Sequence, residues 1–136
     1  MESKKVTVMC FGSFDLLHPG HTFYLREAKK LGDFLVVVIA KDSTIKKIKG
    51  KEPKYNERER LEHIRDLPMV DKGILGYEAD PYEIIEEINP DIICLGYDQN
   101  SFSGNLASEL TKRGMHPKIY RIKPFQEDIY KSSKLK

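Results

Sequence analysis

Short apolar runs alternate along the chain with segments in which apolar residues recur at helical spacing. Five runs have the length and composition of strands, and they span residues 6–11, 34–40, 72–75, 91–95 and 118–122. The run at 34–40 contains no polar residue, which is typical of a strand buried on both faces of a sheet. The alternation therefore predicts a parallel sheet flanked by helices.

Four helices are expected between these strands, at 20–31, 56–66, 80–89 and 106–113. Asn56 and Asp80 are suitable N-terminal caps, and Gly32 and Gly114 are suitable stops. The stretch 41–54 shows no periodicity and is expected to be a mobile, lysine-rich loop. Together the elements predict a single Rossmann-like α/β domain over residues 1–136, with a five-stranded parallel sheet in the order 3-2-1-4-5.

That strand order also predicts where a ligand binds. In open α/β sheets, ligands bind beyond the carboxyl ends of the strands, at the point where the connections reverse direction. The strands at 6–11 and 91–95 flank this point. The segments that follow them, 12–21 and 96–99, are therefore the expected walls of the site.

Composition narrows the class of protein without adding a function. The chain has 136 residues, of which 40% are hydrophobic, and its net charge is +2 from 23 basic and 21 acidic side chains. This balance argues against nucleic-acid binding through a bulk field. No run approaches the roughly 18 apolar residues of a membrane span, and no signal peptide is recognisable. Cys10 and Cys94 lie in expected strands, which favours a reduced, cytoplasmic protein.

Two histidines, His18 and His21, stand where the segment 12–21 enters the first helix. The N–H groups and the dipole at a helix start attract phosphate, and Gly20 allows phosphate to approach the first turn closely. Two imidazoles there can both donate hydrogen bonds to a phosphorus centre that gains negative charge. Taken alone, the spacing also fits structural histidines or a metal pair, although the third ligand of a zinc hydrolase motif is missing.

The string Gly-Ser-Phe-Asp-Leu-Leu-His-Pro-Gly-His at 12–21 resembles the signature of the cytidylyltransferase-like nucleotidyltransferases, and the likeness extends over essentially the whole chain. The resemblance implies nucleotidylyl transfer, with His18 and His21 stabilising the reacting α-phosphate. It implies Mg²⁺ carried by the nucleotide, with no metal ligands assigned to the protein. The role of Asp15 stays open between catalysis and turn building. The nucleotide contacts implied in this segment are Ser13, Phe14, His18, Pro19, Gly20 and His21.

The stretch 41–54 holds six lysines and follows the carboxyl end of the expected second strand. A solvated surface segment is one interpretation of such a run. The resemblance implies instead that one lysine closes on the triphosphate and neutralises the leaving pyrophosphate. Lys46 is the candidate catalytic lysine, with Lys47 and Lys49 as alternatives.

Arg60 matches the arginine of the family's Glu-x-Arg segment after this stretch. As a planar donor it could bind phosphate. An ion pair with Glu57 or Glu59 on a helix surface explains it equally well.

The remaining candidates lie near the fourth strand and the carboxyl terminus. Asp98 is expected to contact the nucleotide, with a simple turn as the alternative. The segment 128–134 resembles the family's closing Ile-Ser-Ser/Thr-Thr motif, which makes 124–136 an expected phosphate-binding tail with Ser132 and Ser133 as its hydroxyls. Phe125 packs either on the nucleotide or on the core.

Three strings, at 41–51, 90–99 and 131–134, look like those of archaeal-type FAD synthases, which transfer AMP from ATP to FMN. One departure is Tyr130, since these relatives often carry a cysteine near the terminal serines. The alternatives are CTP-dependent transfer to glycerol 3-phosphate, adenylyl transfer to another phosphate acceptor, and a non-catalytic nucleotide sensor. Direct in-line attack by the acceptor phosphate is expected. A homodimer without nucleic-acid or membrane partners is also expected.

Overall fold

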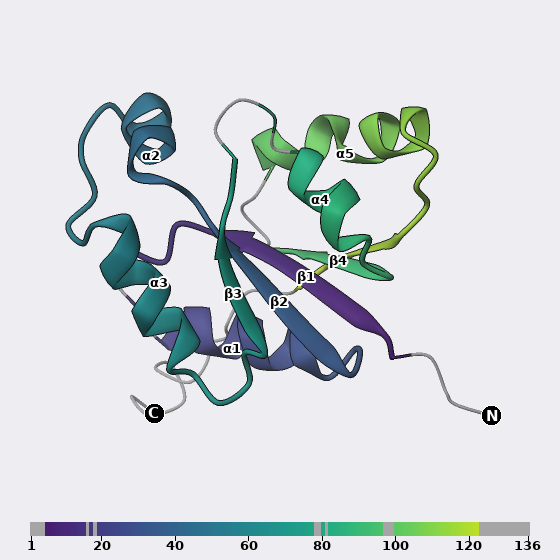
Figure 1. The fold of residues 1–136 in the computed structure, drawn as a ribbon, viewed down its shortest axis with the longest axis horizontal. Coiled ribbons are helices and arrows are strands. Elements are labelled where there is room, and N and C mark those ends of the chain that lie inside the picture. Colours follow the sequence, from purple (N-terminus) through teal and green to yellow (C-terminus); the bar gives the residue numbers. More distant parts are fainter. Residues whose placement is uncertain are drawn as a thin grey trace, which may run out of the picture.

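Five parallel strands form one sheet in the order β3-β2-β1-β4-β5, as the sequence predicts (Figure 1). The computed structural model describes residues 5–15, 17, 19–77, 80, 82–96 and 100–122, and for 100–104 it describes the backbone alone. The strands are β1 (Thr7–Gly12), β2 (Phe34–Ile39), β3 (Lys72–Leu75), β4 (Ile92–Leu95) and β5 (Lys118–Arg121). The helices are α1 (Pro19–Lys29), α2 (Asp42–Lys49), α3 (Glu57–Arg65), α4 (Glu83–Ile88) and α5 (Asn100–Lys112).

Each face of the sheet has its own buried core, because successive strand residues point to opposite sides. Cys10 in β1 packs on one face with residues of α1 and α3, such as Leu25 and Ile64. Its neighbour Met9 packs on the other face with residues of α4 and α5, such as Ile85. Figure 1 shows α4 and α5 together on one side of the sheet and α1 and α3 on the other. The three-layer arrangement explains why the central strands carry almost unbroken apolar runs.

Helix α2 corrects the expectation that residues 41–54 lack regular structure. Asp42 in its first turn suits the positive end of the helix dipole, and Ile45 is buried with 5% of its surface exposed. Gly50 ends the helix in the left-handed region (φ 79°) and donates its N–H to the Lys46 carbonyl at 2.7 Å. One buried isoleucine is too little to produce a visible period. That the stretch is mobile stays a prediction.

The starts of α4 and α5 differ from the sequence expectation, whereas the start of α3 agrees with it. Asn56 caps α3 through a reciprocal capping box with Glu59, as predicted. Asp80 does not cap α4; the N-terminal cap is Tyr82, whose backbone N–H donates to the Asp80 carboxylate at 3.0 Å. Helix α5 begins at residue 100 instead of 106. Its polar, glycine-containing start hides it from a pattern argument, since helix propensity is a weak guide when packing decides.

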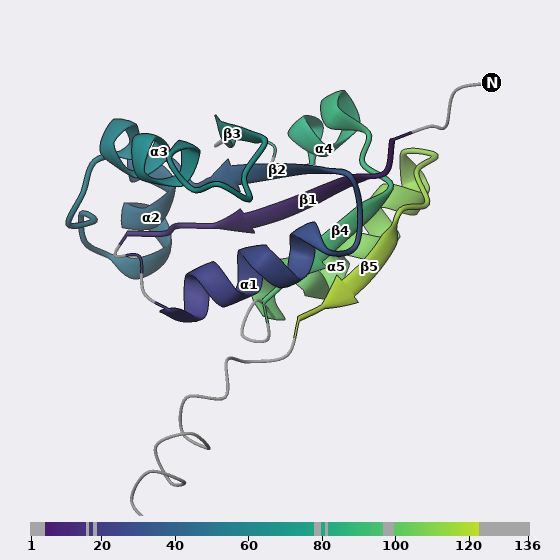
Figure 2. The same cartoon turned by 90° about the horizontal axis from the view of Figure 1, so that it is seen from below.

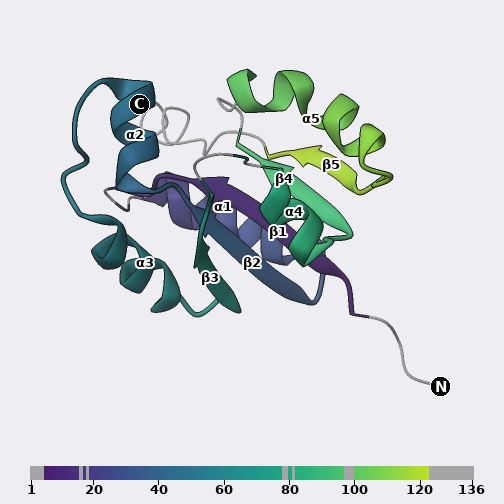
Figure 3. The ribbon, with the colours of Figure 1, turned by 45° about the horizontal axis from the view of Figure 1, so that its top comes forward.

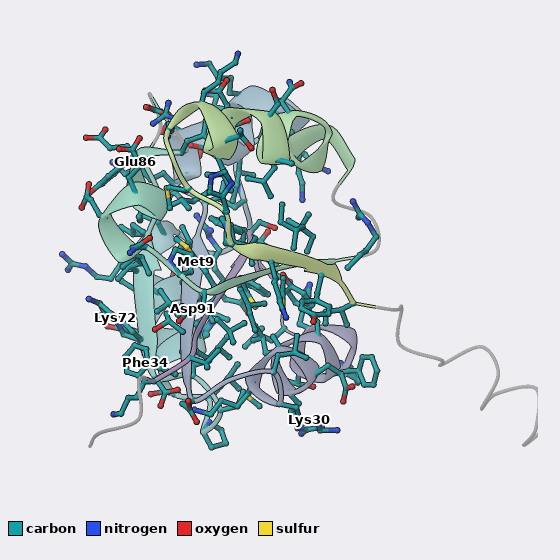
Figure 4. All side chains as sticks on the ribbon, turned by 90° about the vertical axis from the view of Figure 1, so that its right-hand side faces the viewer. Met9, Lys30, Phe34, Lys72, Glu86 and Asp91 are labelled. Atoms are coloured by element: carbon teal, nitrogen blue, oxygen red, sulfur yellow. The ribbon has the colours of Figure 1, made fainter. Side chains whose placement is uncertain are left out.

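An aspartate precedes each of the strands β2, β3 and β4 and closes the sheet at its amino edge. Each aspartate donates its backbone N–H to the carbonyl of one residue near the start of a neighbouring strand, and its carboxylate accepts the N–H of that same residue. The pairs are Asp33 with Val6, Asp71 with Leu35 and Asp91 with Thr7, at carboxylate distances of 2.8, 2.8 and 2.9 Å. Figure 4 shows Phe34, Lys72 and Asp91 near one another at the edge where the strands begin.

Within the part of the chain that the structure describes, no helix is both long enough and apolar enough to cross a bilayer.

Candidate active site

The segment after β1 leaves the sheet at its carboxyl edge and turns back into α1. Figure 2 shows α1 running back along the sheet beneath β1. Pro19, Gly20 and His21 form the first turn of this helix. The positive end of the helix dipole therefore lies at the position where the strand order predicts a ligand. His18, the other histidine of this segment, lies outside the described residues.

Phe14 supports His21 from inside the protein. Its backbone adopts the left-handed region (φ 50°), and only 2% of the residue's surface is exposed. Its ring lies edge-on to the His21 ring, with centroids 5.3 Å apart and an interplanar angle of 73°. It also covers Gly12, where a Cβ atom would come within 2.6 Å of the ring. A contact between Phe14 and a nucleotide would therefore have to use its backbone.

The geometry around His21 limits how its ring can turn. Its Nδ1 atom is buried, and its ring packs against Phe14 in a T-shaped contact. A side chain whose orientation is fixed by packing loses little entropy when it meets a ligand. His21 is thus a pre-oriented imidazole at a helix start.

Asp15 ties this segment to the chain before α3. Its two carboxylate oxygens accept the backbone N–H groups of Lys54 at 2.7 Å and Tyr55 at 2.8 Å. Desolvation raises the pKa of this carboxyl, but the two backbone donors and the nearby Arg60 and Lys49 charges outweigh it and hold the pKa below its ordinary value. Its carboxylate therefore holds together two segments that lie 39 and 40 residues apart along the chain, which is neither a local turn nor direct evidence of catalysis.

Arg60 is fully buried, which neither of its sequence interpretations anticipated. Its guanidinium pairs with Asp42 at 2.7 Å and not with Glu57 or Glu59. It also donates to the carbonyls of Tyr55, Ser13 and Ala40 at 3.0, 2.9 and 2.7 Å. The surface ion pair is therefore wrong, and phosphate binding would require donors that protein oxygens already use.

Helix α2, which carries Lys46, Lys47 and Lys49, lies beyond the carboxyl ends of β1 and β2 (Figure 3). The Lys46 side chain is 62% exposed, and its ammonium lies 3.4 Å from the Glu52 carboxylate. Lys49, three residues further on, is close enough to Asp15 for its charge to lower the pKa of that carboxyl. The charge of Lys49 therefore acts on the segment after β1.

Two contacts near the end of β4 were missed by the sequence analysis. The Tyr24 hydroxyl of α1 donates to the Cys94 carbonyl at 2.8 Å, and burial raises the pKa of this hydroxyl well above its ordinary value. Arg121, at the end of β5, donates to the Gly96 carbonyl at 2.7 Å. The signal available was a tyrosine one turn after His21 and an arginine at the end of a strand, and neither is specific.

Several predicted site residues lie outside the described residues, so the structure does not place them; they are His18, Asp98, Phe125, Ser132 and Ser133. Among the residues that are described, no three His, Cys, Asp or Glu side chains gather in a group that could hold a metal ion.

The chain belongs to the cytidylyltransferase-like family, whose model matches residues 9–136. It is 46% identical to the FAD synthase of Thermoplasma volcanium over 131 residues, which cover 96% of this chain and 92% of that protein. It is 48% identical to the FAD synthase of Aciduliprofundum boonei, with 88% and 80% covered.

Solved structures agree with this fold. A Thermoplasma volcanium GSS1 protein, described as a lipopolysaccharide core biosynthesis protein, superposes with a TM-score of 0.85 at 47% identity, covering 90% of this chain and 100% of that one. The pantoate-beta-alanine ligase of Francisella tularensis, at 13% identity and a TM-score of 0.68, covers 93% of this chain and 62% of its own and shares the fold alone.

Proposed function

We propose that the protein is an FAD synthase, which transfers AMP from ATP to FMN and releases pyrophosphate. The observation that carries this is identity of 46–49% with FAD synthases over 85–96% of the chain. The site geometry agrees with the reaction class, because His21 stands pre-oriented at a helix start on the carboxyl edge of the sheet.

In the proposed reaction an oxygen of the FMN phosphate attacks the α-phosphorus of ATP in line with the bond to the β-phosphate. The new phosphoanhydride bond forms as that bond breaks, and pyrophosphate leaves with the electron pair. His18 and His21 donate hydrogen bonds to the α-phosphate oxygens, where one well-placed donor contributes about 3 kcal/mol to transition-state stabilisation. Ser13 and the backbone of Phe14, Pro19 and Gly20 border the nucleotide.

Magnesium enters this proposal as part of the substrate. Mg²⁺ bound to the ATP phosphates neutralises part of their charge and orients them.

The lysine of α2 that neutralises the leaving pyrophosphate is proposed to be Lys46 or Lys49. Lys46 is exposed and long enough to swing away from Glu52, since an exposed ion pair is weak. Lys49 already lies on the Asp15 side. Lys46→Ala and Lys49→Ala, compared with Lys47→Ala, assign the role to the variant with the larger loss of kcat.

The undescribed part of the chain completes the proposed site. Asp98 would contact the ribose or base, and Phe125 would pack on the nucleotide. Ser132 and Ser133 would bind phosphate through their hydroxyls.

The test is a two-by-two assay with Mg²⁺, in which ATP or CTP is combined with FMN or glycerol 3-phosphate. Pyrophosphate release and FAD, separated by chromatography, are followed together. The proposal expects FAD and pyrophosphate in equal amounts from ATP and FMN alone. Product from CTP with glycerol 3-phosphate alone, ATP turnover with FMN inert, or nucleotide binding without turnover would each contradict it.

The proposed enzyme is a homodimer, a common state among small enzymes. Light scattering on the eluting protein measures the mass directly, and a mass of one chain, 15.7 kDa, at assay concentration contradicts this part of the proposal.

A further inference from the structure

Among the residues that the structure describes, Arg60 is the only charged side chain that is buried, with 0% of its surface exposed. A buried guanidinium is costly unless its charge is compensated and its donors are bonded. Asp42 supplies the opposite charge and accepts from Nη2, and three backbone carbonyls accept the N–H groups of Nε and Nη1, so four of the five N–H donors have printed acceptors.

The partners of Arg60 come from separate segments that meet only at the carboxyl edge of the sheet. Ser13 follows β1 and leads to the histidine segment. Ala40 and Asp42 join β2 to α2, which carries the lysines. Tyr55 precedes α3, and its own N–H is held by Asp15.

The arginine side chain is suited to fixing the relative positions of these segments, which is more than stabilising the fold requires. One Nη atom donates to both Ser13 and Ala40, and so it fixes the separation of the two strand ends. The planar guanidinium sets the directions of all these bonds together, whereas a lysine ammonium is a point charge with freely rotating donors. An apolar side chain of similar volume would fill the space without fixing these directions.

We propose that Arg60 is a positioning residue for nucleotidylyl transfer, holding the histidine segment after β1 and the lysine helix α2 in one relative arrangement through Ser13, Ala40 and Asp42. The inference rests on the proposed function, since it assigns to these two segments the groups that stabilise the transferred phosphate and the leaving group. A displacement of about 1 Å at such a site costs on the order of a hundredfold in rate.

The test compares Arg60→Lys and Asp42→Asn with Arg65→Lys. Arg65 is the matched control, because it lies on the same helix, is exposed, and donates to the Gly73 carbonyl at 3.1 Å away from the site. Asp42→Asn keeps one acceptor oxygen and removes the negative charge, so it covers the case in which Arg60→Lys does not fold. The assays measure kcat and KM for ATP at a temperature where thermal melts show each variant folded.

Arg60→Lys is expected to lower kcat about a hundredfold and Asp42→Asn about tenfold, each with a smaller change in KM, while Arg65→Lys leaves both unchanged. Backbone amide exchange at 13–15 and 41–56 is expected to become faster in the two site variants only. Variants that melt earlier but keep the wild-type kcat and the wild-type exchange at these segments overturn the proposal.

A failure of the proposed function gives a different result from a failure of the Arg60 proposal. Wild-type protein that makes no FAD contradicts the FAD synthase assignment, and exchange at 13–15 and 41–56 still decides the role of Arg60. Unchanged exchange in both site variants would then overturn the positioning proposal independently.

Discussion

The two edges of the sheet use charged side chains in opposite ways. At the amino edge, Asp33, Asp71 and Asp91 each stand directly before a strand and bond the first residues of its neighbour. At the carboxyl edge, Asp15 and Arg60 bond the segments beyond the strands to one another. One edge secures the ladder, and the other secures the loops that follow it.

The difference follows from where a parallel sheet can bind a ligand. Ligands approach the carboxyl ends of the strands, where helices begin and their N–H groups point outward. Carboxylates pointing outward at that edge would repel a triphosphate. The two oxygens of Asp15 instead point toward backbone N–H groups. The amino edge meets no such demand, and carboxylates there stabilise strand ends without a functional cost.

His21→Ala should give the largest effect and separate the two edges most clearly. Loss of one pre-oriented donor to the α-phosphate is expected to lower kcat about 10²–10³-fold with little change in melting temperature. His116→Ala is the control, because His116 is exposed just before β5 at the amino edge. Near-wild-type turnover of the His21 variant would remove the histidine from the proposed mechanism.

Gly12→Ala and Gly32→Ala test the same contrast with identical substitutions. A Cβ at Gly12 would lie 2.6 Å from the Phe14 ring, and one at Gly32 would lie 2.7 Å from the Val6 carbonyl oxygen. Each is expected to lower the free energy of unfolding by about 1–3 kcal/mol, because buried neighbours must shift.

Activity distinguishes the two glycine variants. Gly12→Ala displaces Phe14, which supports His21, so kcat should fall as well. Gly32→Ala should retain wild-type kcat at temperatures where it is folded. Equal kcat values for the two variants would show that packing around Phe14 does not reach the site.

Tyr24→Phe examines the middle of α1, the helix that joins the two edges. The variant loses the hydrogen bond from the hydroxyl to the Cys94 carbonyl, at a cost of about 1 kcal/mol in unfolding free energy. Urea unfolding measures this loss. We expect kcat/KM to stay unchanged. A fall in kcat/KM would show that the site also depends on the hydrogen bond to Cys94.

The fold was accessible from the sequence because apolar runs and stop residues mark the strands independently of their neighbours. The strand order and the location of the histidine segment followed from that pattern. Helix α2 was missed because a single buried residue, Ile45, anchors it. The burial of Arg60 was missed because its partners Ser13, Ala40 and Asp42 are 47, 20 and 18 residues away, and no local pattern reports such distances.

The aspartates of the amino edge carried a repeated signal that was not used, since each directly precedes a strand. A short polar residue before an apolar run is common at loop ends. Only the register of the neighbouring strand shows that its carboxylate completes the ladder.

Asp71→Asn gives the smallest predicted effect and tests the amino edge through pH. Desolvation raises the pKa of the Asp71 carboxyl, but the ammonium of Lys29 and the N–H of Leu35 outweigh it, so the folded-state pKa lies below the ordinary value. A lowered carboxyl pKa stabilises the fold above the ordinary value of about 3.9 and stops doing so as pH falls through the folded-state value.

Asparagine keeps an acceptor for Leu35 and loses the ion pair with Lys29, which is about one-third exposed on both sides. The variant should therefore be less stable by about 0.5–1 kcal/mol at pH 7, and the difference should shrink as the pH falls below the ordinary carboxyl pKa and through the lower folded-state pKa. Melting curves over this range measure it. In a Lys29→Met background the substitution should cost much less at pH 7; an undiminished cost there would mean that the Leu35 bond, and not the ion pair, secures this edge.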